Sequence, residues 1–426
     1  MASIKVGNDN RSFVKDNKPF FYLADTCWSA FTNITIEEWE YYLDLRKKQG
    51  FNVLQINILP QWDASGTELN NYPLPTTDKR IFEFSEFNDE YFDHARKMCI
   101  MAKDKGFDLA LVVLWCNYVP DTWASNMMND NIMPYDFIDE YIKKVNETFS
   151  DLEPIYVISG DTDFNTERTV AHYKKAGELL RELAPEALYT LHIKGRYTYI
   201  PEELLKLVDF YMYQSGHNAE NMAMPYLLAE EMYNKYPVKP IINSEPCYEQ
   251  MGYSRKMYGR FYRYDVRRAA WMSILSGASA GVTYGAHGIY SWHKIGKRFG
   301  MSMGEGFDAP NTWNDAVKYP GAWDYGYIKH LLKTYNITTL EPSEDILINT
   351  TKDIRVASSD NKDKILVYIP INTNVKLNYD LTDYDVFVID LDMKNVGYPD
   401  VEVKEGQSII KMHNFEQDAL AVIIRK

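Results

Sequence analysis

The sequence predicts an α/β protein built on a (β/α)₈ TIM barrel, followed by a small antiparallel β-sandwich domain. Two observations predict the barrel. Short apolar, β-branched runs alternate eight times with longer segments of helical character over residues 1–340. Several predicted strands are followed by long loops, whereas the turns from helix to strand are short. In such barrels the ligand-binding face lies at the carboxyl ends of the strands.

The first four predicted strands lie at residues 19–26, 51–58, 107–115 and 155–161. Helices are expected between them at 35–48, 89–105 and 135–149. The first helix begins with a capping box, Thr35 to Glu38, and ends before Gly50. Long loops follow the second strand, where Trp62 lies, and the third strand.

The second half of the barrel repeats the same alternation. Its strands are predicted at residues 188–193, 209–214, 240–245 and 281–288, and the last two are followed by long loops. Helices are expected at 166–184, 201–206, 219–235 and 264–276.

The pattern changes near Leu340. Apolar runs at residues 354–357, 365–369, 386–391 and 419–424 are separated by Asn, Asp and Gly turns, which predicts the antiparallel β-sandwich. We therefore expect a barrel domain at 1–340 and an accessory domain at 341–426. Packing against the barrel is the expected role of the accessory domain, and ligand binding is the alternative.

The composition favours a neutral or cationic small-molecule partner. The 426 residues are 46% hydrophobic, enough for one large core. The 46 Lys and Arg against 60 Asp and Glu give a net charge of −14, and no basic stripe is visible. This argues against a nucleic acid or an anionic membrane as partner. The aromatic content of 14% favours carbohydrate, whose C–H faces stack on flat rings. The oligomeric state is not predicted.

The four cysteines are widely spaced and form no C-x-x-C pattern, which favours reduced thiols over a disulfide framework or a zinc site. The N-terminal segment has no apolar signal-peptide region, and no run of about 18 apolar residues occurs. We expect a cytoplasmic location, or export if a leader preceded the present N-terminus.

Two predicted strands end abruptly in an acid. Strand four closes on Asp161 and strand seven on Glu245, nearly opposite each other across a barrel mouth. Such a pair suits glycoside hydrolysis, in which one carboxyl group protonates the departing oxygen and the other attacks or stabilises an oxocarbenium-like centre. A separation of about 5–5.5 Å would mean retention, and about 6.5–9.5 Å inversion. The alternative is that each acid only caps the next helix.

A sugar site also needs hydrogen-bond partners for hydroxyl groups and flat faces for stacking. The polar and aromatic side chains near the other strand ends are the candidates, and each has a buried structural role as its alternative. They are Asp25, Trp28, Gln55, Asn57, Trp115, His192, Tyr213, Gln214, Tyr284 and His287. Asp163 and Glu249 lie near the two acids, but we expect them to serve helix N-termini.

Metal and phosphate chemistry are not expected. His192, His217 and His287 come from separate strand ends or loops, and no H-x-H lies on the first strand. The glycines at 277 and 281 precede the eighth strand, on the face opposite the predicted site.

Four segments resemble the apiosidase-like glycoside hydrolases, similar to glycoside hydrolase family 140. They are Ala-Asp-Thr-Cys-Trp at 24–28, the helix at 35–46 running into Gly-Phe-Asn at 50–52, Ser-Gly-Asp at 159–161 and Asn-Ser-Glu at 243–245. The likeness covers nearly the whole chain. Those enzymes pair such a barrel with a small C-terminal β-domain of a type once labelled collagen-binding. The resemblance implies a retaining mechanism with Asp161 as acid/base and Glu245 as nucleophile, without metal or cofactor.

We therefore expect a glycoside hydrolase that acts on chain ends and releases a terminal apiose- or arabinofuranose-like sugar from an oligosaccharide or glycoside. Two alternatives stay open. One is a carbohydrate-binding barrel without catalysis. The other is an inverting glycosidase or a transglycosidase that uses the same carboxylate pair.

Overall fold

The computed structural model describes residues 3–253, 257–299 and 310–426. Eight parallel strands form one sheet in the order β8-β7-β6-β5-β4-β11-β10-β9. The ends of this sheet meet, because the Asp209 N–H, just before β9, donates a hydrogen bond of 2.8 Å to the carbonyl of Tyr189 in β8. The sheet is thus a nearly closed barrel, and the predicted fold class is confirmed.

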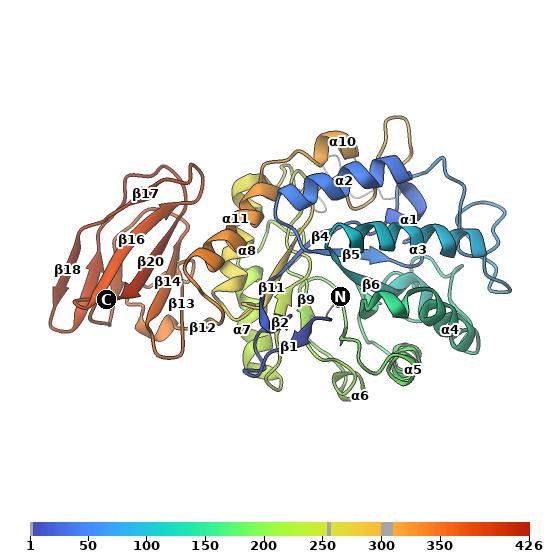
Figure 1. The fold of residues 1–426 in the computed structure, drawn as a ribbon, viewed down its shortest axis with the longest axis horizontal. Coiled ribbons are helices and arrows are strands. Elements are labelled where there is room, and N and C mark those ends of the chain that lie inside the picture. Colours follow the sequence, from blue (N-terminus) through green and yellow to red (C-terminus); the bar gives the residue numbers. More distant parts are fainter. Residues whose placement is uncertain (1–2, 254–256, 300–309) are drawn as a thin grey trace.

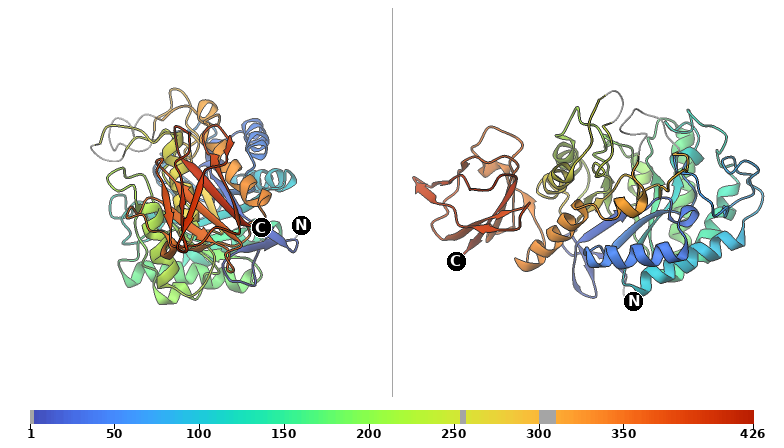
Figure 2. Two further views of the ribbon diagram at one scale, coloured as in Figure 1. Left: turned by 90° about the vertical axis from the view of Figure 1, so that its left-hand side faces the viewer. Right: turned by 90° about the horizontal axis from the view of Figure 1, so that it is seen from above.

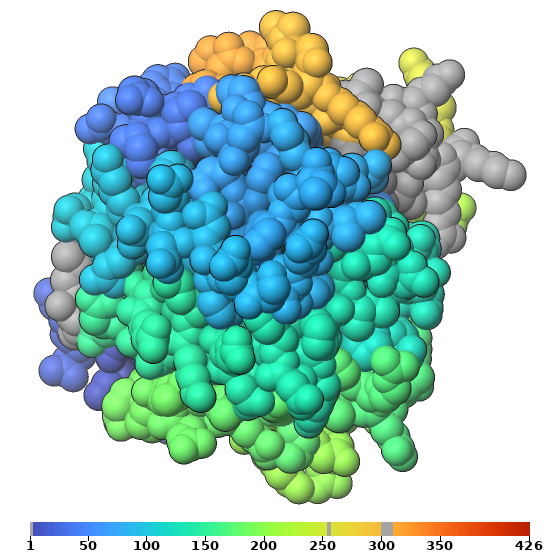
Figure 3. Space-filling model, turned by 90° about the vertical axis from the view of Figure 1, so that its right-hand side faces the viewer, coloured from blue at the N-terminus to red at the C-terminus, as the bar shows by residue number. Residues whose placement is uncertain are grey.

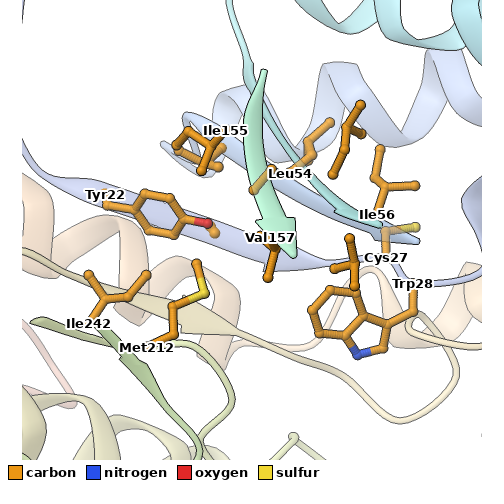
Figure 4. Close-up of a cluster of buried hydrophobic side chains, with 14 of the residues drawn as sticks. Tyr22, Cys27, Trp28, Leu54, Ile56, Ile155, Val157, Met212 and Ile242 are labelled. Atoms are coloured by element: carbon orange, nitrogen blue, oxygen red, sulfur yellow. The ribbon is translucent and has the colours of Figure 1, made fainter. Parts of the chain in front are cut away.

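Every residue of these barrel strands is buried, as expected for parallel strands packed on both faces. The strands are β4 (Tyr22–Thr26), β5 (Val53–Asn57), β6 (Asp108–Trp115), β7 (Ile155–Gly160), β8 (Tyr189–Thr190), β9 (Tyr211–Tyr213), β10 (Ile241–Asn243) and β11 (Gly281–Tyr284). Figure 4 shows part of the core, where Tyr22, Val157 and Met212 approach one another from β4, β7 and β9.

Helices surround the barrel (Figure 1). They are α1 (Ala30–Asn33), α2 (Ile36–Lys48), α3 (Asp89–Asp104), α4 (Phe137–Phe149), α5 (Glu167–Leu183), α6 (Glu202–Leu205), α7 (Met224–Lys235), α8 (Arg263–Ile274), α10 (Trp313–Ala316) and α11 (Gly321–Thr334). The predicted capping box is confirmed, since the Thr35 hydroxyl accepts the Glu38 N–H and the Glu38 carboxylate accepts the Thr35 N–H. None of the helices in the described ranges has the length and apolar character needed to cross a membrane.

Two parts of the barrel region differ from the sequence prediction. Residues before 22 form a separate three-stranded sheet of β1 (Lys5–Val6), β2 (Phe13–Lys15) and β3 (Lys18–Phe20). The Phe13 ring packs against Phe210, with centroids 5.1 Å apart, so this sheet covers the amino-terminal end of the barrel. Helices α10 and α11 after β11 were also not predicted, and residues 300–309 of the preceding loop lie outside the described residues.

The C-terminal region contains two antiparallel sheets. The larger has the order β12-β13-β14-β20-β16-β17 and the smaller β15-β19-β18. Four of these strands match the predicted runs, and the shorter ones were missed. The strands are β12 (Glu341–Pro342), β13 (Arg355–Ser358), β14 (Lys364–Ile369), β15 (Val375–Leu377), β16 (Tyr384–Asp390), β17 (Val396–Gly397), β18 (Val401–Lys404), β19 (Gln407–Ile410) and β20 (Ala419–Arg425). Short 3₁₀ turns lie at Cys116–Tyr118, Ser150–Leu152 and Glu344–Ile346.

We call these C-terminal sheets the β-domain. It lies at one end of the elongated molecule beside α8 and α11 (Figure 1), and the view from above in Figure 2 also places it to one side of the barrel. Buried ion pairs join the two parts. Arg267 of α8 is 1% exposed and its Nε lies 3.1 and 3.0 Å from the two carboxylate oxygens of Asp418. Its Nη1 also donates a 2.8 Å hydrogen bond to Asp324 of α11.

We expect Arg267→Ala to lower the free energy of unfolding by about 3–5 kcal/mol, because it leaves the buried carboxylate of Asp418 without its cation, whereas Asp324 keeps Arg263 and Lys394. Urea denaturation followed by tryptophan fluorescence measures this. The control is Lys206→Ala, which removes an exposed pair with Glu202 and should cost less than about 0.5 kcal/mol. Equal stability of the Arg267 variant and the wild type would contradict the expectation.

Candidate active site

A cavity of about 210 Å³ opens at the carboxyl ends of the barrel strands. It brings together five of the residues predicted from the sequence, which are Trp28, Trp115, Asp161, Gln214 and Glu245. Asp161 follows β7 and Glu245 follows β10, the fourth and seventh barrel strands in chain order. The two acids therefore share one cavity, as the strand-end pattern predicts.

Two histidines contact the carboxylate of Glu245. Nε2 of His217 lies 2.9 Å from Oε1 in a hydrogen bond. Nε2 of His192 lies 3.2 Å from Oε2, without the alignment of a full hydrogen bond. Glu245 is 6% exposed, so these imidazoles supply most of the polar surroundings of a buried carboxylate.

The backbone sets the tautomer of both histidines. The N–H of Asp161 donates to Nδ1 of His192 at 3.0 Å, and the N–H of Tyr248 donates to Nδ1 of His217 at 3.3 Å. A nitrogen that accepts a hydrogen bond carries a lone pair, so we assign the proton of each ring to Nε2. Both rings can then be neutral and still present an N–H to Glu245.

The two acids are shifted in opposite directions. Burial opposes ionisation of Glu245, but the contacts with His192 and His217 outweigh it and hold the pKa of Glu245 well below its usual range. Burial raises the pKa of Asp161 well above its usual range, and repulsion from Glu245 adds to this increase. Glu245 therefore ionises first as the pH rises, and Asp161 keeps its proton to a higher pH than Glu245 does.

Glycines make room for the aromatic rings of the cavity. A Cβ atom at Gly160 would lie 2.0 Å from Cε3 of Trp115, so the indole ring can cross the end of β7 only above a glycine. Gly285 has the same relation to Tyr248, whose Cδ1 would lie 2.0 Å from a Cβ atom there. Asp161 itself has φ 47°, in the left-handed region that Asp tolerates better than most residues.

Three polar atoms of the cavity residues are buried without a hydrogen-bond partner in the described part of the chain. They are Nε1 of Trp115, Oε1 of Gln214 and Oε2 of Glu245. Leaving such groups unpaired is costly in a folded protein, and a ligand rich in hydroxyl groups would supply both the acceptor and the donors that they need.

The other predicted residues do not line the cavity. His192 lies behind Glu245, where it contacts both acids. Asp25 accepts hydrogen bonds from Tyr42 and Arg46 of α2, so its side chain faces the helix layer. Tyr213 and Tyr284 also point outward, because their hydroxyls donate to the carbonyl of Pro225 and to Glu249. These side chains therefore face away from the cavity, in contrast to the direct sugar contacts that the sequence predicts for them.

Three further predicted residues form their polar contacts outside the cavity. Gln55 is inside the barrel, where its amide contacts Tyr22, Thr283 and the carbonyl of Ser244. His287 lies 3.3 Å from the carbonyl of Gln250, and burial lowers the pKa of His287 to about 3. Asn57 donates to Gln61 at 2.8 Å and reaches the cavity only through it.

The sequence prediction missed several cavity residues, which are Gln61, Asp63, Trp123, His217 and Tyr248. His217 was considered only as a metal ligand, although it lies three positions after Gln214, a predicted site residue at the end of β9. Trp123 donates through Nε1 to the carbonyl of Asp161 at 2.6 Å. Trp123 comes from the loop after β6, and a loop has no hydrophobic periodicity from which a functional side chain could be predicted.

Asp163 and Glu249, which lie near Asp161 and Glu245 in the sequence, have different structural roles. Asp163 accepts the Trp123 N–H at 3.1 Å and the Lys194 ammonium at 2.8 Å, so it fixes the loop after β6 instead of serving a helix. Glu249 accepts the N–H of Gly321, the first residue of α11, at 2.8 Å, in agreement with the predicted helix N-terminal role. Among the described residues, no group of three or more His, Cys, Asp or Glu side chains is arranged to hold a metal ion.

Comparisons with known proteins agree with the fold. Residues 8–339 match the family model described as "Apiosidase-like, catalytic domain". A solved structure described as a glycoside hydrolase has a TM-score of 0.80 at 22% identity, over 100% of this chain and 97% of that chain. A family 5 glycoside hydrolase from Bacteroides vulgatus ATCC 8482 has a TM-score of 0.81 at 22% identity, over 99% and 93% of the two chains. A search of curated proteins found no match.

We expect Glu245→Gln to lower the pKa of Asp161, because the substitution removes a negative charge that opposes its ionisation. Titration of ¹³C-labelled aspartate side chains by NMR measures the shift. Glu249→Gln is the control, since Glu249 lies outside the cavity, and it should leave the Asp161 titration in place. An unchanged Asp161 pKa in the Glu245 variant would refute the electrostatic coupling.

We expect Gly160→Ala to lower the free energy of unfolding by about 1–3 kcal/mol, since the new methyl group overlaps the Trp115 ring. Denaturant titration measures this. Gly66→Ala is the matched control, because the nearest atom to its Cβ would be 3.7 Å away. Similar costs for the two variants would argue against the fit of Trp115 over Gly160.

Proposed function

The chain belongs to the family of apiosidase-like catalytic domains and is a glycoside hydrolase, and from this premise we propose that it is a retaining enzyme acting on chain ends. In this proposal Glu245 is the nucleophile and Asp161 the general acid/base. The observation that carries the assignment of the two acids is the opposite shift of their pKa values in one cavity, since a glycosidase needs one ionised and one protonated acid before bond cleavage. The retaining course is proposed from the resemblance to the family.

The first step breaks the glycosidic bond. Oε2 of Glu245, which has no full hydrogen bond from the described residues, attacks the anomeric carbon and forms a glycosyl ester. The proton of Asp161 passes to the departing oxygen, which leaves as an alcohol. The Nε2–H groups of His192 and His217 orient the carboxylate and stabilise its charge before attack.

The second step restores the enzyme. Asp161, now ionised, takes a proton from a water molecule, whose oxygen attacks the anomeric carbon. The bond to Oε2 breaks, Glu245 returns as a carboxylate, and the sugar leaves with the configuration of the substrate. The reversal of roles at Asp161 suits a group whose pKa is raised, because it both gives and accepts a proton near neutral pH.

The small cavity supports the release of a terminal sugar. Its volume of about 210 Å³ is below the range of about 300–1,000 Å³ usual for drug-sized ligands, so it suits a single sugar unit. We propose an apiose- or arabinofuranose-like residue as that sugar, in keeping with the name of the family. The rings of Trp28 and Trp115, with centroids 5.3 Å apart, offer apolar surface for its C–H groups.

A panel of aryl furanosides and pyranosides, with apiosides and arabinofuranosides included, tests this proposal. We expect wild-type protein to cleave one glycoside class, and Glu245→Ala to lower kcat by about 10³-fold or more. Added azide should restore turnover in the Glu245 variant as a glycosyl azide of inverted configuration, because a small anion can replace the missing nucleophile.

Asp161→Ala distinguishes the two roles. It should slow glycosides with poor leaving groups far more than those with nitrophenol leaving groups, which depart without a proton. Inverted configuration in the first-formed product of the wild type would overturn the retaining mechanism. Folded protein that cleaves no member of the panel would count against the activity on these sugars.

A further inference from the structure

Asp63 is a third acid in the catalytic cavity, beside Asp161 and Glu245. It lies in the loop at residues 58–88 between β5 and α3, which forms a broad part of the surface at the end remote from the β-domain (Figure 3, light blue). Hydrolysis by Asp161 and Glu245 uses two carboxyl groups and gives Asp63 no role.

Contacts with the barrel fix the position of Asp63. The Asn57 amide, at the end of β5, donates to Oε1 of Gln61 at 2.8 Å, and Nε2 of Gln61 donates to Oδ1 of Asp63 at 2.8 Å. Beyond Asp63, the carbonyl of Ser65 accepts a hydrogen bond of 2.9 Å from the side chain of Asn33. The loop is therefore anchored on both sides of Asp63, and Gln61 is the one other residue in the described part of the chain that donates a hydrogen bond to its carboxylate.

The ionised carboxyl group of Asp63 destabilises the folded protein. Burial raises the pKa of Asp63 to about 6, and repulsion from Glu245 contributes to the increase. No ion pair with Asp63 is formed among the described residues, in contrast to Asp163, which has Lys194. A group that opposes folding, lines a ligand cavity and has no paired cation in the described chain is better explained by binding than by stability.

We propose that Asp63 is a sugar-binding residue, whose Oδ2 accepts a hydrogen bond from a hydroxyl group of the sugar held between Asp161 and Glu245. This rests on the proposed function. The relay from Asn57 through Gln61 gives the carboxylate one orientation, so its free oxygen recognises a hydroxyl group at one place on the ring. Asp63 thereby contributes to the choice of sugar, and its charge favours the cationic transition state.

The test compares Asp63→Asn with wild type on the aryl glycoside that wild type cleaves fastest. Asn keeps an acceptor for Gln61 but replaces the free oxygen and the charge. We expect kcat/KM to fall about 10- to 100-fold, as for a lost hydrogen bond to a charged group. Glu83→Gln removes an exposed carboxylate from the same loop and should change kcat/KM less than twofold.

Thermal unfolding separates binding from a structural role. The pKa of Asp63 is higher in the folded protein than in the unfolded chain, so its ionised form opposes folding above pH 6. Asp63→Asn should therefore melt at the same or a higher temperature than wild type at pH 8, and the difference should shrink towards pH 4. A lower melting temperature together with lost activity would overturn the proposal in favour of a loop anchor.

The two proposals can fail separately. If wild type cleaves the glycoside and Asp63→Asn does so within twofold, the Asp63 proposal is wrong and the proposed function stands. If wild type cleaves none of the panel, the proposed hydrolysis of these sugars is wrong. Binding of the same glycosides to wild type and to Asp63→Asn, measured by saturation-transfer NMR, then tests whether Asp63 binds the sugar. Equal affinity of the two proteins, or no binding to either, overturns the proposal.

Discussion

The contact of Glu245 with two imidazoles is the interaction on which the rest of the site depends. An ionised carboxylate in a buried position costs several kcal/mol unless donors surround it. Here it is paired with His192 and His217. The other nitrogen of each ring accepts a backbone N–H, from Asp161 and from Tyr248. The charge of Glu245 thus depends on two backbone N–H groups that orient the imidazole rings beside it.

His192 also links the two acids. It contacts the carboxylate of Glu245 through one nitrogen and the backbone of Asp161 through the other. Gly160, the residue before Asp161, contributes to this arrangement, because the lack of a Cβ atom lets the ring of Trp115, at the end of the neighbouring strand β6, cross the end of β7. Asp161 follows in the left-handed conformation. Asp161, Gly160 and Trp115 therefore together fix the positions on which the different pKa values of the two acids depend.

The sequence predicted the barrel and both acids because strand ends are visible as abrupt changes from apolar to polar residues. It did not predict which side chains face inward. A parallel strand buried on both faces reads as a continuous apolar run, so Asp25 and Tyr284 looked equivalent to Trp28 and Gln214. Asp63 and Trp123 were missed for a different reason. They reach the cavity from long loops, whose conformation depends on contacts with distant residues and leaves no periodic signal.

A raised pKa alone does not separate functional acids from structural ones in this fold. Burial raises the pKa of Glu249 to about 7, yet its contacts with the Tyr284 hydroxyl and the Gly321 N–H tie it to the outer layer. Burial also raises the pKa of Asp25, which is paired with Arg46. Asp161 and Asp63 differ because they line the cavity and form no ion pair within the described chain. Position in the cavity and the lack of a fixed cation, together with the shifted pKa, are what identify an acid whose partner is a ligand.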